Sequence, residues 1–208
     1  MIMTENGRLK IGVLASGSGS NLQAIIDASR MGMIPVEVVL VLSDKPDAYA
    51  LQRAEQAGIA TAVVRPAEYA SREEYDAEIV RLLQQAGVGA VALAGYMRLV
   101  TTVLLDAFPQ RVLNIHPALL PSFPGLHGQR QAFEYGVKVS GCTVHFVAAG
   151  LDSGPIILQA PVPVLEDDDA DTLAARILEQ EHIIYPLALK LLAEGKLTIE
   201  GRRVRIAE

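Results

Sequence analysis

The sequence is poor in cysteine and in long apolar runs. Cys142 is the only cysteine among 208 residues, which excludes an intrachain disulfide and a zinc site built on several cysteines. No apolar run is long enough to span a membrane, and residues 1–10 lack the apolar stretch of a signal peptide. These absences predict a soluble protein of the cytoplasm, without contact with a membrane.

An excess of positive charge is also absent. The formal net charge is −6, and no basic stretch is long enough to hold a phosphate backbone, so we expect no nucleic-acid partner. A small phosphorylated ligand is compatible with this charge, because a few backbone N–H groups can bind one phosphate. The spacing of the His, Asp and Glu residues does not resemble a metal site, and we predict no metal.

The apolar residues predict one α/β domain over residues 1–208. Short apolar runs typical of strands lie at 10–15, 36–42, 61–64, 90–94 and 111–115, and helical patterns lie between them at 21–30, 47–57 and 71–86. The third helix has a capping-box pattern in Ser71 and Glu74, and Gly87 follows its end. Buried strands that alternate with helices predict a Rossmann-like, mostly parallel sheet with helices on both faces.

The pattern changes in the C-terminal half. Two longer strands at 138–147 and 155–164, joined by a turn at 150–154, predict an antiparallel extension of the sheet. The acidic run 166–169 suits the start of a long helix to about residue 193. The segment 197–206 predicts a final hairpin.

A glycine-rich loop follows the first strand. In Gly17-Ser18-Gly19-Ser20-Asn21, the glycines allow a tight turn, and the next helix presents its N-terminal N–H groups. Leu22 occupies the third glycine position of a dinucleotide fingerprint, which favours a single phosphate over a pyrophosphate. The alternative is an ordinary turn capped by Ser20 or Asn21.

An amide and an imidazole lie two residues apart in Asn114-Ile115-His116-Pro117. In an extended segment these two side chains point the same way, and the proline then ends the strand. An amide can donate to a developing oxyanion, and a histidine can act as an acid or base near neutral pH, which together suit acyl-group chemistry. The alternative is an inert polar strand end.

Two further residues are ambiguous from spacing alone. Asp152 lies in a turn and by default bonds its own backbone; a functional Asp152 would lie beside His116 and raise its pKa. His145 fits equally a core histidine, a partner of a site residue or a site residue. A Ser–His–Asp hydrolase is disfavoured because no nucleophile elbow is present, and Cys142 has no activating neighbour in its apolar strand.

Taken together, these segments resemble the phosphoribosylglycinamide formyltransferase family, folate-dependent enzymes of purine biosynthesis. The segments that carry the resemblance are 16–25, 71–76, 93–98, 113–121, 143–147, 151–157 and 180–186. The resemblance implies a catalytic trio of Asn114, His116 and Asp152, a phosphate loop of Gly19, Ser20 and Asn21, Glu181 near the acceptor amine, and a folate side made by Arg72, Met97, Arg98, Leu99 and Val100.

The resemblance also implies the reaction. The formyl group of the co-substrate 10-formyltetrahydrofolate passes to the amine of 5′-phosphoribosylglycinamide through a tetrahedral intermediate. It further implies a nucleotide-binding half at 10–115, a folate and catalytic half at 116–195, and a monomer or homodimer with small-molecule substrates.

Three alternatives belong beside this expectation. Formyltetrahydrofolate deformylase shares the Asn-x-His core but carries an N-terminal regulatory domain, whereas the first strand here begins about ten residues into the chain. Methionyl-tRNA formyltransferase adds a C-terminal domain, and few residues follow the long helix here. A non-catalytic Rossmann-type nucleotide-binding module is disfavoured by the missing third glycine and by the presence of His116 and Asp152.

Overall fold

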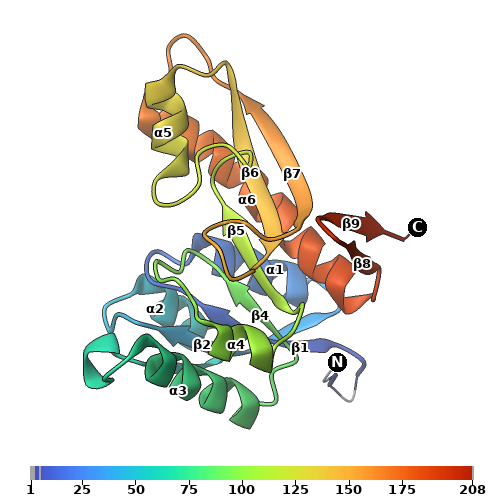
Figure 1. The fold of residues 1–208 in the computed structure, drawn as a ribbon. Helices are drawn as coiled ribbons and strands as arrows, with labels where there is room; N and C mark the ends of the chain where they lie inside the picture. Colours follow the sequence, from blue (N-terminus) through green and yellow to red (C-terminus); the bar gives the residue numbers. More distant parts are fainter. Residues whose placement is uncertain (1–2, 5, 208) are drawn as a thin grey trace.

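A continuous sheet forms the centre of the computed structural model, which describes residues 3–4 and 6–207 (Figure 1). Its strands are β1 (Leu9–Leu14), β2 (Val36–Ser43), β3 (Ala60–Val63), β4 (Ala90–Leu93), β5 (Val112–His116), β6 (Val139–Phe146), β7 (Ile156–Pro163), β8 (Leu197–Glu200) and β9 (Arg203–Ile206). Their order across the sheet is β3-β2-β1-β4-β5-β6-β7-β9-β8. The first five strands are parallel, β6 runs antiparallel to β5, and β7 runs antiparallel to β6. The predicted fold class is therefore confirmed.

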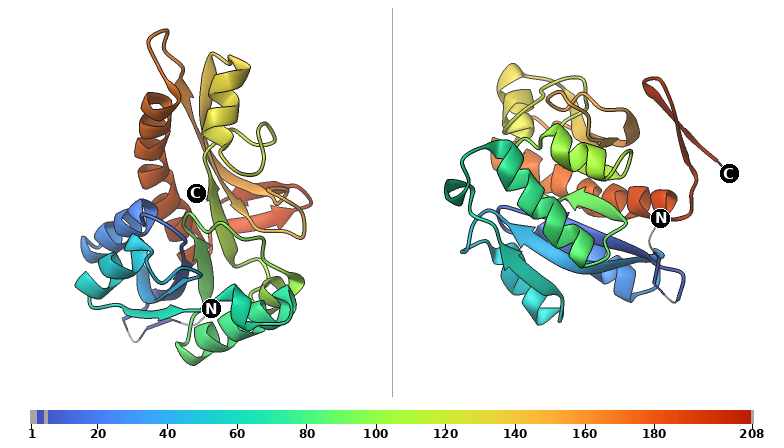
Figure 2. Two further views of the ribbon diagram at one scale, coloured as in Figure 1. Left: turned by 90° about the vertical axis from the view of Figure 1, so that its left-hand side faces the viewer. Right: turned by 60° about the horizontal axis from the view of Figure 1, so that its bottom comes forward.

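Helices cover both faces of the sheet. They are α1 (Ser20–Arg30), α2 (Tyr49–Gln56), α3 (Arg72–Gln85), α4 (Thr102–Ala107), α5 (Gly128–Tyr135) and α6 (Ala170–Ala193), with a 3₁₀ turn η1 (Pro66–Glu68). Side chains of a strand alternate between two apolar cores: Val41 packs with α1, α2 and α6, whereas Leu40 and Leu42 pack with α3 and α4. Figure 2 shows α1 and α2 on one side of the strands and α3 on the other.

The ends of α3 follow the predicted capping chemistry with one difference. Ser71 Oγ accepts the Glu74 backbone N–H at 3.1 Å, and the N–H groups of Gly87 and Val88 close the C-terminus on carbonyls of the last turn. The Glu74 carboxylate accepts from the backbone N–H of Ala70, not from that of Ser71 as a capping box requires. The helix start is thus as predicted, and the return bond is shifted by one residue.

Two helices were not expected from the sequence. Helix α4 has only 6 residues, so it contains too few turns for an apolar period to emerge. Helix α5 begins after His127, which has a left-handed backbone (φ 59°) and makes no capping bond through its side chain. Figure 1 shows α5 on an arm formed with β6, β7 and the first turns of α6.

The strand order places a cleft at one end of the sheet. The chain leaves β1 toward β2 on one side, whereas β4 and β5 lie on the other side, so the carboxyl ends of β1 and β4 mark the switch point. In open α/β sheets, ligands bind beyond the strands at such a point. The antiparallel β6 and the long α6 complete the walls there.

Candidate active site

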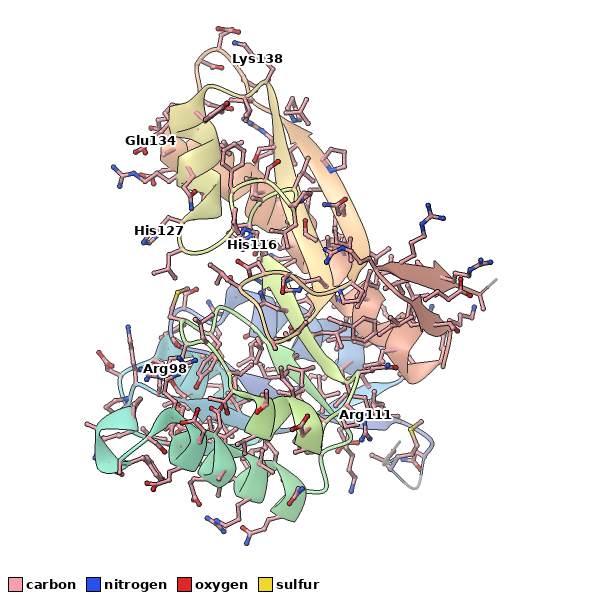
Figure 3. All side chains as sticks on the ribbon, viewed as in Figure 1. Arg98, Arg111, His116, His127, Glu134 and Lys138 are labelled. Atoms are coloured by element: carbon pink, nitrogen blue, oxygen red, sulfur yellow. The ribbon has the colours of Figure 1, made fainter. Side chains whose placement is uncertain are left out.

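A cavity of about 890 Å³ opens at the carboxyl ends of β1, β4 and β5. This volume is within the usual range for sites that bind a small molecule. All the site residues predicted from the sequence line it: Gly19, Ser20, Asn21, Arg72, Met97, Arg98, Leu99, Val100, Asn114, His116, Asp152 and Glu181. In Figure 3, Arg98 lies on the main body below His116, and His127 lies on the loop beside it, whereas Arg111 marks the opposite end of β5.

The glycine-rich loop is held in shape from α2. Gly19 has φ 71°, and a Cβ there would lie 2.7 Å from the Cα of Ala50, so the loop and α2 fit only with glycine. Arg53 on α2 donates through Nε to the Ser18 carbonyl at 2.8 Å, and its guanidinium lies over the Tyr49 ring. The N-cap of α1 is Gly19, which has no side chain to bind the first N–H groups of the helix, and Gly19, Ser20 and Asn21 line the cavity.

Asn21 links this loop to α6. Its side-chain nitrogen donates to Glu181 Oε2 at 2.7 Å, and the other amide atom, Oδ1, is buried without a partner among the described residues. Burial raises the pKa of Glu181 from 4.5 to about 6, although the bond from Asn21 acts in the opposite direction. The pair therefore places a carboxyl with a pKa of about 6 on the cavity wall.

The floor of the cavity is the end of β5. His116 is 3 % exposed, and its Nε2 lies 2.8 Å from the Phe123 carbonyl, which can only accept, so Nε2 carries a hydrogen. Helix α5 can lie this close only because its first residue is Gly128, where a Cβ would be 2.9 Å from His116 Nε2. The histidine is thus fixed through Nε2, and Nδ1 is the ring nitrogen left for another partner.

Asp152 lies against that free nitrogen. Its Oδ2 is 3.4 Å from His116 Nδ1 and accepts the Gly125 backbone N–H at 2.7 Å. Asp152 has a left-handed backbone (φ 44°), which aspartate tolerates better than most residues. The fold therefore brings together His116 and Asp152, which are 36 positions apart in the sequence.

The net effect on the His116 pKa differs from the expectation. Burial lowers this pKa and outweighs the opposing influence of the Asp152 carboxylate and the Phe123 carbonyl, so it lies below its ordinary value of 6.5. Burial alone would raise the pKa of Asp152, but the Gly125 N–H and the charge of protonated His116 hold it below its ordinary value. Asp152 opposes the loss of the His116 proton without reversing the effect of burial.

His145 belongs to the same cluster. It is opposite Asn114 in the β5–β6 register, and its Nε2 lies 3.2 Å from Asn114 Nδ2 and 3.7 Å from Asp152 Oδ1. The sequence left its role open, because the register that brings it to Asn114 is not visible in the spacing of either strand. Of the three interpretations, its position beside Asn114 and Asp152 favours a partner of a site residue.

The opposite wall is formed by the loop after β4. Arg72 donates to the Leu99 carbonyl at 3.0 Å, and Ser16 Oγ accepts the Met97 backbone N–H. Arg98 lies with its guanidinium 5.3 Å from the centre of the Tyr75 ring. Met97 and Leu99 are both 57 % exposed, so this wall offers apolar side chains beside two held arginines.

Comparisons with known proteins identify the family. The family model "Formyl transferase" matches residues 9–189. The chain belongs to the formyl transferase family. A phosphoribosylglycinamide formyltransferase of Escherichia coli is 48 % identical over 189 residues, which cover 91 % of this chain and 89 % of that protein. The crystal structure of glycinamide ribonucleotide transformylase 1 from Symbiobacterium toebii has a TM-score of 0.96 at 60 % identity and covers 98 % of this chain and 96 % of that chain.

Some relatives of this formyl transferase are much longer. The trifunctional purine biosynthetic protein adenosine-3 of Drosophila melanogaster is 51 % identical over 199 residues, which are 95 % of this chain but 15 % of that protein. The similarity therefore concerns one segment of the trifunctional protein.

Backbone groups of the formyl transferase site were missed by the sequence reasoning. The Phe123 carbonyl and the Gly125 N–H fix His116 and Asp152, and Gly128 makes room for them. The glycines in 125–128 were the available indication, because close packing against a functional side chain often requires glycine.

Within residues 3–4 and 6–207, no group of three metal-ligating side chains is close enough to hold a metal ion, and no helix is long and apolar enough to cross a membrane.

Proposed function

We propose that this formyl transferase moves the formyl group of 10-formyltetrahydrofolate to the amine of 5′-phosphoribosylglycinamide. The observation that carries the proposal is the floor of the cavity, where the Asn114 amide and the His116–Asp152 pair lie between the glycine-rich loop and a partly apolar wall. The products are N-formylglycinamide ribonucleotide and tetrahydrofolate. The similarity to phosphoribosylglycinamide formyltransferases named for this acceptor supports the choice.

The proposed mechanism is direct attack. The acceptor nitrogen adds to the formyl carbon, a C–N bond forms, and the carbonyl electron pair moves onto oxygen. Asn114 and protonated His116 donate hydrogen bonds to this oxyanion. Such donation is usually the largest single contribution to transition-state stabilisation in acyl transfer. The bond from the formyl carbon to N10 then breaks, and the proton lost by the acceptor nitrogen is delivered to N10.

The roles of His116 and Asp152 follow from their fixed geometry. Because His116 Nε2 is bound to the Phe123 carbonyl, the exchangeable proton is the one on Nδ1, directly beside Asp152. A histidine whose pKa is lowered by burial gives up this proton readily, and the aspartate stabilises the imidazolium that precedes the loss. Asp152 therefore makes a buried histidine usable as an acid.

The two substrates occupy opposite walls in this proposal. The phosphate lies at Gly19, Ser20 and Asn21, where a helix N-terminus and backbone N–H groups attract an anion, and Glu181 lies toward the acceptor amine. The folate lies along Arg72 and the segment 97–100. Holding the two reactants in line accounts for a large part of the acceleration, roughly 7–11 kcal/mol in favourable cases.

The test is a purified-enzyme assay with the ribonucleotide and 10-formyltetrahydrofolate, with deformylated folate measured in the presence and absence of the acceptor. We expect turnover only with both substrates, and a loss of roughly 10²–10³ in turnover for Asn114→Ala. Glu134→Gln, at an exposed ion pair on α5, is the matched control and should leave turnover unchanged. Folate turnover without the acceptor would identify a deformylase, and binding of both ligands without turnover would identify a binding module.

We further propose a single domain that works in the cytoplasm as a monomer or homodimer. The division into 10–115, 116–195 and a hairpin at 196–208 stays a prediction, and it does not follow the two walls, because Arg72 and 97–100 on the folate wall lie within 10–115 and Glu181 lies within 116–195. Because the chain has a single cysteine, Cys142, it forms no internal disulfide, which suits a reducing compartment. Burial raises the pKa of the Cys142 thiol to about 12, so we assign it no catalytic role. Sedimentation of the purified protein distinguishes the two assembly states.

A further inference from the structure

His145 is the one buried histidine of the cluster for which the mechanism above has no use. It is 2 % exposed on β6, directly opposite Asn114 on β5. Side chains of residues that face each other across antiparallel strands are close enough to form a pair. A polar ring at this depth needs hydrogen-bond partners, and the identity of those partners determines which nitrogen carries the hydrogen.

The main-chain partner fixes the tautomer. Nδ1 of His145 lies 2.8 Å from the Phe146 carbonyl oxygen, and a carbonyl only accepts. Nδ1 must therefore carry the hydrogen, and in a neutral ring Nε2 then has a lone pair. Nε2 faces Asn114 Nδ2 at 3.2 Å, and an amide nitrogen only donates, so the two assignments agree with each other.

This pairing orients the Asn114 amide. With its nitrogen toward His145, one N–H is bound to the ring, and the second N–H is left for a ligand in the cavity that Asn114 lines. The opposite orientation would bring the amide oxygen against the lone pair of Nε2. The neighbouring carboxylate, Asp152 Oδ1, is 3.7 Å from Nε2, beyond hydrogen-bond distance, so Asn114 is the nearer partner.

We propose that His145 is a positioning residue that, as the neutral Nδ1–H tautomer, holds the Asn114 amide with its nitrogen donor toward the reacting oxygen. The proposal deepens the proposed function, on which its kinetic part rests. It predicts that His145 acts through Asn114 and not through contact with either substrate.

The direct test is nuclear magnetic resonance of the ¹⁵N-labelled full chain without substrates, which reports the hydrogens on both ring nitrogens of each histidine. We expect His145 to show a protonated Nδ1 and an unprotonated Nε2 at neutral pH. A ring protonated at Nε2 alone or at both nitrogens would overturn the proposal. This result does not depend on which reaction the enzyme catalyses, so it separates failure of this inference from failure of the proposed function.

A matched pair of variants tests the consequence for turnover. The amide of glutamine reaches the place of Nε2, so His145→Gln keeps an acceptor for Asn114; the amide of asparagine reaches only the place of Nδ1, so His145→Asn removes that acceptor. We expect kcat to fall about 10-fold or more in His145→Asn with little change in KM, and most of it to return in His145→Gln. Circular dichroism and thermal unfolding establish that both variants fold.

The double variant decides whether the two residues act together. In an Asn114→Ala background, His145→Asn should cause almost no further loss of kcat, because the amide that it positions is already absent. Equal losses in His145→Gln and His145→Asn, or a full additional loss in the double variant, would show that His145 acts structurally or independently.

Discussion

Glu181 is expected to lower the stability of the folded enzyme at neutral pH. Its side chain is 6 % exposed on the cavity wall, and burial raises its pKa from 4.5 to about 6. Between these values the folded state binds the proton more tightly than the unfolded chain, so stability decreases as pH rises through this window. The difference of about 1.5 pKa units corresponds to about 2 kcal/mol, because one unit is 1.36 kcal/mol.

Glu181→Gln removes this cost and keeps the internal bond. The amide oxygen of glutamine can accept the Asn21 side-chain N–H that the carboxylate accepts at 2.7 Å. We therefore expect the variant to be more stable than the parent by about 2 kcal/mol near pH 8. Near pH 4.5 we expect a gain of only about 0.4 kcal/mol. Its affinity for the acceptor should fall, which is the usual exchange of function for stability at a binding site.

Urea unfolding followed by circular dichroism at the two pH values measures this difference, since the chain has no tryptophan for fluorescence. Glu179→Gln, at an exposed position of the same helix, is the control and should change stability by less than about 0.5 kcal/mol at either pH. The reasoning is refuted if Glu181→Gln gains nothing near pH 8, or gains the same amount at both pH values.

Three further changes test the geometry of the floor and of the walls. Asp152→Asn removes the charge that opposes the effect of burial on the His116 pKa, so this pKa falls further. The pH profile of kcat should move to lower pH, and kcat should fall roughly 10²-fold or more; an unmoved profile would contradict the pairing of the two residues. Gly128→Ala forces a methyl group against His116 Nε2, and calorimetry should show a loss of roughly 1–3 kcal/mol together with reduced kcat; a stable, fully active variant would show that α5 can move away. Tyr185→Phe removes a buried hydroxyl that lies 3.0 Å from carbonyls of both β4 and β5, and should cost about 1–3 kcal/mol in urea unfolding; a neutral result would mean that these carbonyls find other donors.

The sheet and most helices could be predicted because their residues repeat a local pattern. The apolar run over β1 and the capping serine at Ser71 each define an element from a few neighbouring residues. Helix α5 has no such pattern, because it begins at Gly128 and its N-cap residue, His127, makes no capping bond through its side chain. Its position depends on packing against the end of β5, where Gly128 meets His116, 12 positions earlier in the chain.

The candidate site divides in the same way. Asn114 and His116 could be paired from their spacing within one strand, because alternation places them on the same face. The contact of His145 with Asn114 depends on the register between β5 and β6, which is not encoded in either strand alone. The sequence indicated correctly that Asp152 would raise the pKa of His116. Burial lowers this pKa by more, and the depth of burial cannot be read from the sequence.

The separation between a floor built by strands and the donor wall built by the loop after β4 has a consequence for protein engineering. Asn114, His116 and His145 lie within hydrogen-bonded strands, whereas most of the contacts proposed for the donor lie in the segment 97–100 after β4. Loops tolerate exchange of sequence better than the strands that support them. Grafting a different loop after β4 therefore offers a way to change the formyl donor while the reacting groups stay in place.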